Sequence, residues 1–222
     1  MLIRLPDVLS ADELAKLDAL FAGMRFEDGT ATAGSAARDV KQNRQAVERQ
    51  PNIDPARKLV TAALSRCEAF LDHTLPLRLV PPLFSVYEPG MRYGAHTDNA
   101  LMSLPLVRTD VAVTLFVSSP TDYDGGELVI EADGAAQSIK LAAGSAVAYS
   151  ATTVHHVAPV TRGKRRAAVT WVQSLVRDDA QREVLLDLQL ALRRLRDLAP
   201  DARETLLLSK ARANLLRMWS EP

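Results

Sequence analysis

The chain has 222 residues, of which 47% are hydrophobic and 24% are charged. This length and composition are typical of one large globular domain with its own core, and they exclude disordered, collagen-like and disulfide-rich proteins. Because 27 basic residues balance 27 acidic ones, no net charge draws the protein to nucleic acid or to an anionic membrane, and we expect neither as a partner.

The sequence also indicates where the protein works. Cys67 is the only cysteine, which excludes an intrachain disulfide and fits a reducing compartment. The first residues lack the apolar segment of a signal peptide, and no apolar run approaches the ~18 to 20 residues of a membrane span. We therefore predict a cytoplasmic protein.

Two helices are predicted in the first third of the chain. Ser10 and Glu13 have the spacing of a capping box and precede apolar residues at helical intervals, which predicts a helix over 11–22. A second helical pattern covers 54–73. Residues 27–52 between them are rich in small and polar side chains with weak periodicity, so we predict a long surface loop.

Residues 77–175 have the pattern of a β protein. Short runs of β-branched and aromatic residues are separated by turn signals such as Glu88–Gly90 and Asp124–Gly126. Eight such runs without helices between them predict an antiparallel sandwich or barrel. The helical period returns after Arg177, and a break at 199–201 divides this tail into two helices.

These elements predict a mainly β protein with flanking helices, of the α+β class. Residues 1–176 would form one domain, with N-terminal helices and a β core at about 77–176. Residues 177–222 would form a helical extension. Because leucines such as Leu185, Leu188 and Leu192 gain roughly 1.5 to 3 kcal/mol each on burial, we expect this extension to pack on the core or on another subunit in a homo-oligomer.

Histidines and a carboxylate in the β region point to a metal site. His96 and Asp98 are two residues apart, so on an extended strand their side chains lie on the same face. A second imidazole, from His155 or His156, would complete a set of two histidines and one carboxylate. That ligand set suits non-haem Fe(II) and leaves three coordination positions open.

Arg165, a basic residue that follows these histidines in the sequence, suggests that a small anion binds beside the metal. Residues 161–164 have the composition of a turn, so we predict a hairpin in which the strand carrying His155 folds back against the strand beginning at Arg165. At ~3.3 Å per residue, the two would be roughly 16 Å apart along the sheet. A metal and a short dicarboxylate fill this span, and a guanidinium binds a carboxylate through two parallel hydrogen bonds. The spacing therefore fits 2-oxoglutarate, and strand alternation directs Arg166 to the opposite face.

Several short motifs follow one another along the β region: Tyr87, Tyr93, His96-x-Asp98, Gly125-Gly126-Glu127-Leu128 and His155-x-Val157-x-Pro159-Val160-x-x-Gly163-x-Arg165. In this order they resemble the Fe(II)/2-oxoglutarate dioxygenases of the prolyl 4-hydroxylase type. The sequence is more closely similar to the bacterial PKHD-type hydroxylases, which share the stretch around Tyr-Gly-x-His-x-Asp-Asn-Ala and the ending Trp-x-Gln-Ser-x-Val-Arg. The resemblance covers nearly the whole chain, including the helical tail.

The resemblance implies a double-stranded β-helix (jelly-roll) core, catalytic Fe(II), 2-oxoglutarate as cosubstrate, and L-ascorbate (vitamin C) as a helper that keeps the iron reduced. By position, His96, Asp98 and His155 match the catalytic iron ligands. Arg165 matches the residue that binds the distal carboxylate of 2-oxoglutarate, and Tyr87 matches a tyrosine that contacts the cosubstrate. The family's interval of ten residues between the second histidine and the arginine selects His155 and not His156.

The implied reaction is hydroxylation of a C–H bond by O2, coupled to decarboxylation of 2-oxoglutarate to succinate and CO2. Its substrate is a small molecule or a peptidyl residue. Because related bacterial proteins are associated with iron uptake, a siderophore-like molecule is one candidate. We expect Lys41–Gln45 and Asn99–Asp110 to form the walls of the substrate site.

Two other functions share part of this pattern. A zinc-dependent hydrolase could use the same three ligands, but it would need a placed general base and gives Arg165 no task. A non-catalytic jelly-roll protein that binds a metal or small molecule, or acts as a sensor, would not need all four of these residues. Decarboxylation of 2-oxoglutarate that depends on Fe(II) distinguishes the oxygenase from both.

Overall fold

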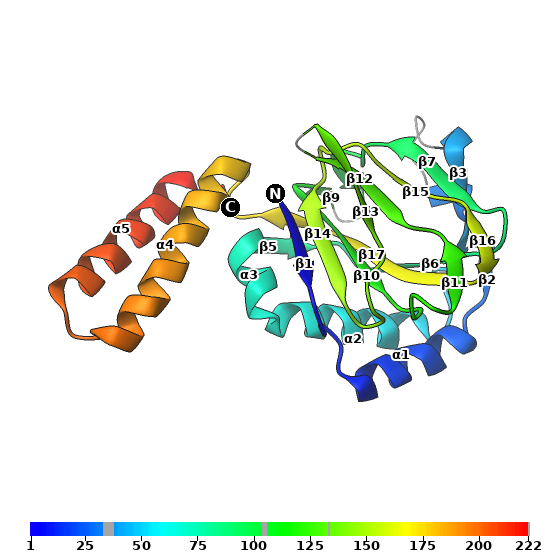
Figure 1. The fold of residues 1–222 in the computed structure, drawn as a ribbon, viewed down its shortest axis with the longest axis horizontal. Helices are drawn as coiled ribbons and strands as arrows, with labels where there is room; N and C mark the ends of the chain where they lie inside the picture. Colours follow the sequence, from blue (N-terminus) through cyan, green and yellow to red (C-terminus); the bar gives the residue numbers. More distant parts are fainter. Residues whose placement is uncertain (33–37, 104–105, 133, 222) are drawn as a thin grey trace.

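The computed structural model describes residues 1–32, 38–103, 106–132 and 134–221. Two antiparallel β-sheets lie face to face, three helices cover the outer face of the larger sheet, and a pair of helices extends from one end (Figure 1). The predicted class, mainly β with flanking helices, is confirmed. In spatial order the larger sheet contains β1 (Leu2–Leu5), β14 (Ala146–Ser150), β10 (Val111–Phe116), β17 (Arg165–Ser174), β6 (Leu83–Tyr87), β4 (Arg44–Ala46) and β2 (Phe26–Asp28), with β5 (Pro76–Leu79) also paired to β17.

The smaller sheet packs against the larger one. It contains, in spatial order, β13 (Ala135–Ile139), β12 (Leu128–Ala132), β15 (His155–Val157), β7 (Arg92–His96) and β3 (Lys41–Gln42). Two short ladders lie beside the sheets: β8 (Leu101–Ser103) with β9 (Leu106–Arg108), and β11 (Tyr123–Gly125) with β16 (Val160–Gly163).

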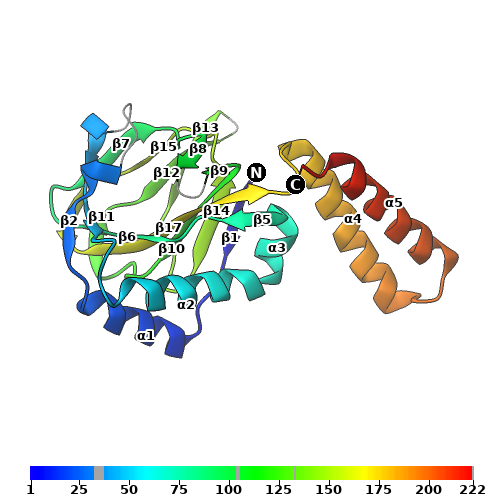
Figure 2. The same ribbon diagram turned by 180° about the vertical axis from the view of Figure 1, so that it is seen from behind.

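Two hydrophobic layers hold these parts together. The helices α1 (Ala11–Ala22), α2 (Ile53–Arg66) and α3 (Glu68–Thr74) pack on the outer face of the larger sheet (Figure 2). Strand β10 shows how both layers form, because its alternate residues point to opposite faces. Val111, Val113 and Leu115 join the helices, whereas Ala112 and Phe116 join the layer between the two sheets. A strand covered on both faces is apolar throughout.

The N-terminal helices differ in part from the prediction. Helix α1 has the predicted bounds, and its capping box is present, since the Ser10 side chain accepts from the Glu13 N–H and the Glu13 carboxylate accepts from the Ser10 N–H. The single helix predicted over 54–73 is wrong. The chain leaves helical geometry at Cys67, whose φ and ψ are −76° and 103°, and this extended residue separates α2 from α3.

The surface loop predicted over 27–52 is also wrong. Besides 3-10 turns at Gly29–Thr32 and Arg38–Val40, this stretch contains β3 and β4, and β4 pairs with β6 inside the larger sheet. Polar residues have low intrinsic strand propensity, but pairing with an existing edge overrides it. The side chains of Lys41, Asn43 and Gln45 are buried between the sheets.

The hairpin predicted around 161–164 does not form. Residues Val160–Gly163 are strand β16, which pairs with β11, and β15 and β17 belong to different sheets. The chain therefore crosses from the smaller sheet to the larger one before Arg165. His155 and Arg165 face each other across the interior instead of lying along one sheet.

The C-terminal tail forms the two predicted helices, α4 (Asp179–Leu198) and α5 (Arg203–Trp219). Asp178 caps α4 by accepting from the Gln181 N–H. Near its base the tail is joined to the domain by a small apolar cluster around Leu75, Val176 and Leu185, and the remainder projects outward (Figure 1). None of the described helices is long and apolar enough to cross a membrane.

Candidate metal centre

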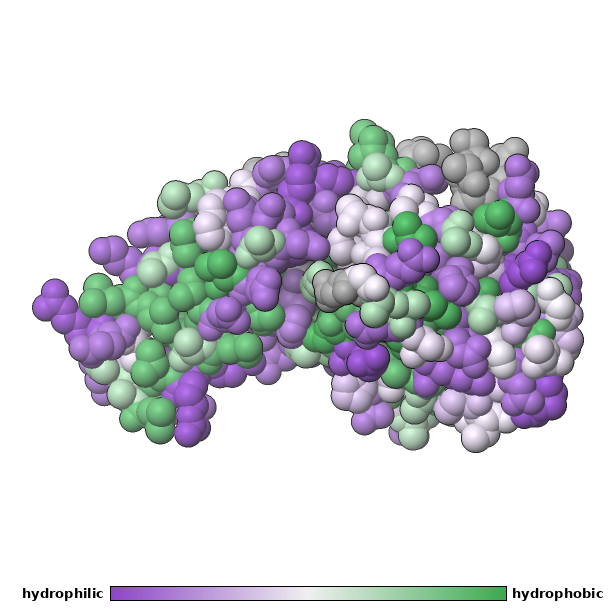
Figure 3. Space-filling model, turned by 45° about the horizontal axis from the view of Figure 1, so that its top comes forward, coloured by the Kyte–Doolittle hydropathy of each residue, from purple (hydrophilic) through white to green (hydrophobic). Residues whose placement is uncertain are grey.

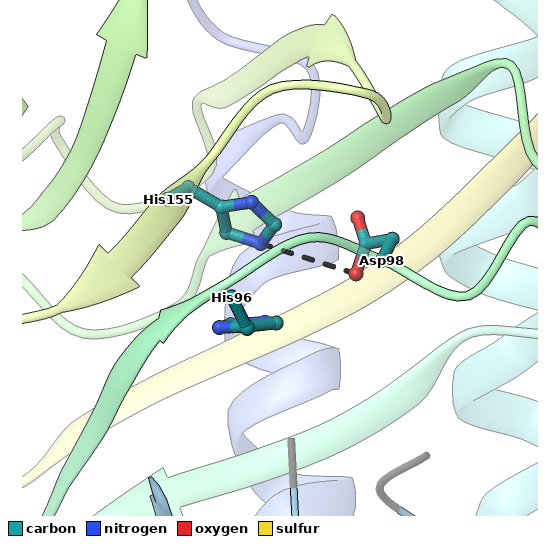
Figure 4. Close-up of side chains that lie close together, drawn as sticks. All are labelled: His96, Asp98 and His155. Carbon is teal, nitrogen blue, oxygen red and sulfur yellow. Dashed lines mark ion pairs between the residues drawn. The ribbon is translucent and has the colours of Figure 1, made fainter. Parts of the chain in front are cut away.

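Three candidate ligands meet at the inner face of the smaller sheet. His96 is the last residue of β7, Asp98 follows two residues later, and His155 begins β15. Strands β7 and β15 are antiparallel neighbours in which His96 lies opposite His155. One ligand atom from each of the three residues lies within 4.8 Å of the others, and the side chains converge as Figure 4 shows. The structure thus brings together the three residues predicted from the sequence.

Backbone contacts orient both imidazoles. The Nδ1 atom of His96 is 2.8 Å from the Gly94 carbonyl oxygen, and Nδ1 of His155 is 3.0 Å from the Thr153 carbonyl oxygen. A carbonyl oxygen only accepts, so each Nδ1 carries a proton and Nε2 is the ring atom that can bind a metal. Such hydrogen bonds fix the orientation of the ring and so prepare a histidine to bind a metal.

The electrostatics of the three side chains also favour a cation. Burial lowers the pKa of His96 to about 4, assisted by the neighbouring His155, so this imidazole is neutral at pH 7. Burial raises the pKa of Asp98, and its Oδ2 atom has no hydrogen-bond partner among the described residues. Oδ1 of Asp98 is 3.9 Å from His155 Nε2. A divalent ion would remove the cost of this buried carboxylate, so the donor set fits a metal.

The ligands line a cavity of about 110 Å³ whose opposite wall holds Arg165. This residue, the first of β17, is 1% exposed. Its Cζ atom lies 5.1 Å from the Tyr87 ring centroid and 5.5 Å from that of Phe116, and its Nε atom has no hydrogen-bond partner among the described residues. A buried guanidinium needs an anionic partner. The cavity therefore fits an anion that extends from the three ligands to Arg165.

The two tyrosines considered in the sequence lie on opposite walls of this cavity. Tyr87 is directly opposite Arg165 in the β6–β17 ladder and is 4% exposed. Tyr93 belongs to the smaller sheet and stacks on His96, with ring centroids 3.7 Å apart. Tyr87 thus lies beside the guanidinium, and Tyr93 supports a metal-ligand candidate.

The neighbours of the candidate residues point away from the cavity. His156 lines a separate hollow together with Arg92 and Asp39. Arg166 reaches helix α1, where its Nη1 atom is 2.8 Å from Oδ1 of Asp18. Strand alternation thus separates each member of the His155–His156 and Arg165–Arg166 pairs as predicted.

The cavity also contains residues whose burial the sequence analysis missed. Lys41, Asn43 and Gln45 line it, and the Lys41 ammonium donates to Oε1 of Gln45 at 3.0 Å. Burial lowers the pKa of Lys41 to about 8, against the opposing effect of the Asp28 and Asp98 charges. The spacing of i, i+2 and i+4 is the signal that could have identified one inward face of an extended segment.

Comparison with known proteins gives matches along most of the chain. The profile of the 2OG-Fe(II) oxygenase superfamily matches residues 82–173, and that of the PKHD-type hydroxylase C-terminal domain matches residues 179–221. A PKHD-type hydroxylase of Paraburkholderia xenovorans is 45% identical over 229 residues, and one of a Synechococcus strain is 46% identical over 223 residues. Both alignments cover 100% of each chain.

Solved structures give the same fold at lower sequence identity. A prolyl-4-hydroxylase of Pseudomonas putida is 20% identical with a TM-score of 0.51, and the match covers 78% of this chain and 92% of that one. A Trichoplax adhaerens prolyl hydroxylase, solved with a peptide of the hypoxia inducible factor, is 16% identical with a TM-score of 0.57 and covers 83% and 86%. These likenesses confirm the predicted jelly-roll fold.

Proposed function

The chain belongs to the PKHD-type hydroxylases, a family of Fe(II)/2-oxoglutarate oxygenases, and we propose that His96, Asp98 and His155 hold its iron. The observation that carries this proposal is the convergence of their three ligand atoms within 4.8 Å. Two Nε2 atoms and one carboxylate form the facial set that suits non-haem Fe(II). The enzyme is accordingly a dioxygenase.

The second part of the proposal concerns the cosubstrate. Arg165 binds the distal carboxylate of 2-oxoglutarate, and Tyr87 contacts the same end of the molecule. Supporting observations are the 1% exposure of Arg165, its Nε atom without a partner among the described residues, and the Tyr87 ring beside its guanidinium. The apolar surroundings exclude water and strengthen this charged contact.

The proposed reaction is hydroxylation of a substrate C–H bond, coupled to decarboxylation of 2-oxoglutarate to succinate and CO2. Iron, when bound, supplies the activation of O2 that no side chain can provide. The protein binds the cosubstrate at Arg165 and surrounds the reaction with buried residues of both sheets. A zinc hydrolase or a non-catalytic sensor gives no reason for a buried arginine opposite the metal ligands.

The prime substrate is proposed to enter beside Asp98. An outer groove of about 820 Å³ shares Thr97 and Asp98 with the cavity and is lined in part by Ala100, Leu101 and Arg108–Asp110. The groove is several times larger than the cavity of about 110 Å³, so most of a prime substrate would lie in the groove. These residues support the wall predicted at 99–110, of which residues 104–105 lie outside the described part. Of the wall predicted at 41–45, Lys41, Asn43 and Gln45 line the cavity, whereas Gln42 and Arg44 are exposed.

The groove is compatible with a peptidyl residue or with a siderophore-like small molecule, and a role in iron uptake is proposed on the resemblance alone. Ascorbate as the reductant that keeps the iron reduced follows from the same resemblance. The cytoplasmic location predicted from the single cysteine, and the absence of a nucleic-acid partner, stay predictions.

The helical tail is proposed to join two copies of the chain. Hydrophobic side chains gather over α4 and α5 on the face shown in Figure 3, and Leu198, Leu206 and Met218 are 64%, 70% and 73% exposed. Exposed apolar patches of this kind mark interaction surfaces. Light scattering should give a dimer or larger for the wild type and a monomer for the L206E/M218E variant, whereas a monomeric wild type would refute this part.

The reaction itself is tested by purified protein incubated with 2-oxoglutarate under air. Succinate should form with Fe(II) and not with Zn(II), and the H155A variant should form none. The H156A variant is the matched control, because its imidazole lines a different hollow. Succinate formation by H155A at the wild-type rate would exclude the proposed metal site.

A further inference from the structure

Tyr123 is a buried tyrosine to which the proposed function gives no role. It lies on β11, is 0% exposed, and its hydroxyl has no hydrogen-bond partner among the described residues. The Nε atom of Arg165 is also buried and also has no hydrogen-bond partner among the described residues. Since nearly all buried polar atoms in proteins are hydrogen-bonded, two such groups near each other require an explanation.

The glycine at position 126 shows how close these two side chains are. A Cβ atom placed on Gly126 would be 2.9 Å from Cγ2 of Val160 and 3.1 Å from both Cδ of Arg165 and Cε2 of Tyr123. Nε is bonded to Cδ, so the inner end of the guanidinium lies next to the Tyr123 ring. Burial raises the pKa of Tyr123, and the positive charge of Arg165 lowers it, which agrees with this proximity.

A lysine on the neighbouring segment fixes the Tyr123 ring. The Lys140 ammonium lies 4.0 Å from the ring centroid and donates to the Tyr123 carbonyl oxygen at 2.8 Å. A cation above a ring and a backbone hydrogen bond together limit how far that ring can move. The phenol is therefore a rigid neighbour for the arginine.

We propose that Tyr123 is a positioning residue for cosubstrate binding, which extends the proposed function and rests on it. Arg165 lines the cavity, whereas Tyr123 is absent from the described residues that do so, so Tyr123 acts through Arg165. The proposal pairs the two groups that have no hydrogen-bond partner among the described residues: when the carboxylate binds, the Tyr123 hydroxyl oxygen would accept from the Arg165 Nε–H group. The two Nη groups then remain directed at the cavity, where they present the parallel N–H donors that a carboxylate binds.

The experiment compares two 2-oxo acids that differ in the distal carboxylate. Titration calorimetry on the Mn(II)-loaded protein would give the Kd of 2-oxoglutarate and of 2-oxobutyrate, which lacks that group. The Y123F variant keeps the ring and removes the acceptor. Loss of one hydrogen bond that acts on the carboxylate only through Arg165 corresponds to about a three- to tenfold higher Kd for 2-oxoglutarate, whereas the Kd for 2-oxobutyrate should stay the same.

A second pair of variants gives an answer even if Y123F fails to fold. In G126A the added methyl meets Arg165 and Tyr123 as well as the Val160 side chain, whereas in G134A it has no atom of the described residues within 4 Å, at a similarly positive φ of 76°. Both carry the backbone strain of an alanine at positive φ. Only G126A should raise the Kd of 2-oxoglutarate relative to that of 2-oxobutyrate.

The coupling between Tyr123 and Arg165 distinguishes positioning from a purely structural role. In an R165M background, Y123F should have no further effect on the Kd of 2-oxoglutarate. Equal weakening of both 2-oxo acids, or no change in either, would overturn the proposal for Tyr123. Failure of the wild-type Mn(II) protein to bind 2-oxoglutarate would instead overturn the proposed function on which it rests.

Discussion

The two sheets contribute different chemistry to one cavity. The smaller sheet supplies His96 and His155 at a point where the β7–β15 pairing is irregular, with a register shift between His155 and Val157. The larger sheet supplies Arg165 at the start of β17, a ten-residue strand paired in regular register with β6 and β10. Metal-ligand candidates thus lie beside an irregular pairing, and the candidate anion site begins a long, regularly paired strand.

This division predicts that metal binding and cosubstrate binding can be lost separately. Residues of the smaller sheet would govern the affinity for the metal, and those of the larger sheet would govern the affinity for 2-oxoglutarate. Loss of the metal also removes the anchor for the 2-oxo acid, so the informative variants are those of the larger sheet: one that weakens metal binding as much as 2-oxoglutarate binding would show that the two walls do not act independently.

The largest effect is expected in the smaller sheet. Replacing Asp98 with alanine leaves only two imidazoles as metal ligands. Loss of a residue that merely hydrogen-bonds to a ligand lowers metal affinity about 10- to 100-fold, so loss of a ligand itself should lower the affinity for Mn(II) by more. Titration calorimetry with Mn(II) measures this loss directly. Full metal occupancy in D98A would contradict the assignment of the site to the smaller sheet.

The next largest effect is expected in the larger sheet. The R165A variant loses a charged hydrogen bond of about 1.5 to 3 kcal/mol, which raises the Kd of 2-oxoglutarate roughly ten- to a hundredfold. Lysine should restore only part of the affinity, because a point charge replaces the planar fork. Metal affinity should not change. R166A is the matched control, since its side chain pairs with Asp18 on the outer face, and a defect there would move the anion site.

A smaller effect distinguishes the two tyrosines. Y87F removes a hydroxyl group close to Arg165 and should raise the Kd of 2-oxoglutarate about three- to tenfold. Y93F removes a hydroxyl group from the smaller sheet but keeps the ring that stacks on His96, so the Kd of 2-oxoglutarate should stay near the wild-type value. The opposite order of effects would place the cosubstrate contact on the smaller sheet.

The sequence predicted the metal-ligand candidates better than the topology around them. His96 and Asp98 could be paired because strand alternation places residues i and i+2 on one face, a local rule. The hairpin predicted between His155 and Arg165 was wrong, because the chain passes from the smaller sheet to the larger one through β16, which pairs with the distant β11. No local signal contains that long-range partner.

The same limit explains the stretch over 27–52. Its polar composition is typical of a loop, and only the exposed edge of β6 makes β4 a strand. Lys41 was therefore expected on a surface wall, whereas it is 6% exposed inside the cavity. Burial of a lysine next to metal-ligand candidates depends on tertiary structure that composition cannot indicate.

The smallest expected effect is on protein stability and concerns the buried charge of Lys41. This side chain extends from β3 of the smaller sheet and donates to Gln45 on β4 of the larger one. Its pKa is lowered from 10.5 to about 8, with burial as the main cause. The unfolded chain keeps this proton up to about pH 10.5 and the folded apoprotein releases it near pH 8. Between these values the unfolded state binds more protons, so the stability of the wild type should rise with pH.

The K41M variant removes the buried charge and its titration. At pH 7 it should be about 1 kcal/mol more stable than the wild type, because the relief of charge burial exceeds the loss of one hydrogen bond. Urea unfolding of both apoproteins from pH 7 to pH 10 would measure the difference, which should shrink as the pH rises through 8. A constant difference would show that Lys41 is not destabilised by burial. Lys41 lines the cavity together with Asp98, so K41M should combine higher stability with slower succinate formation.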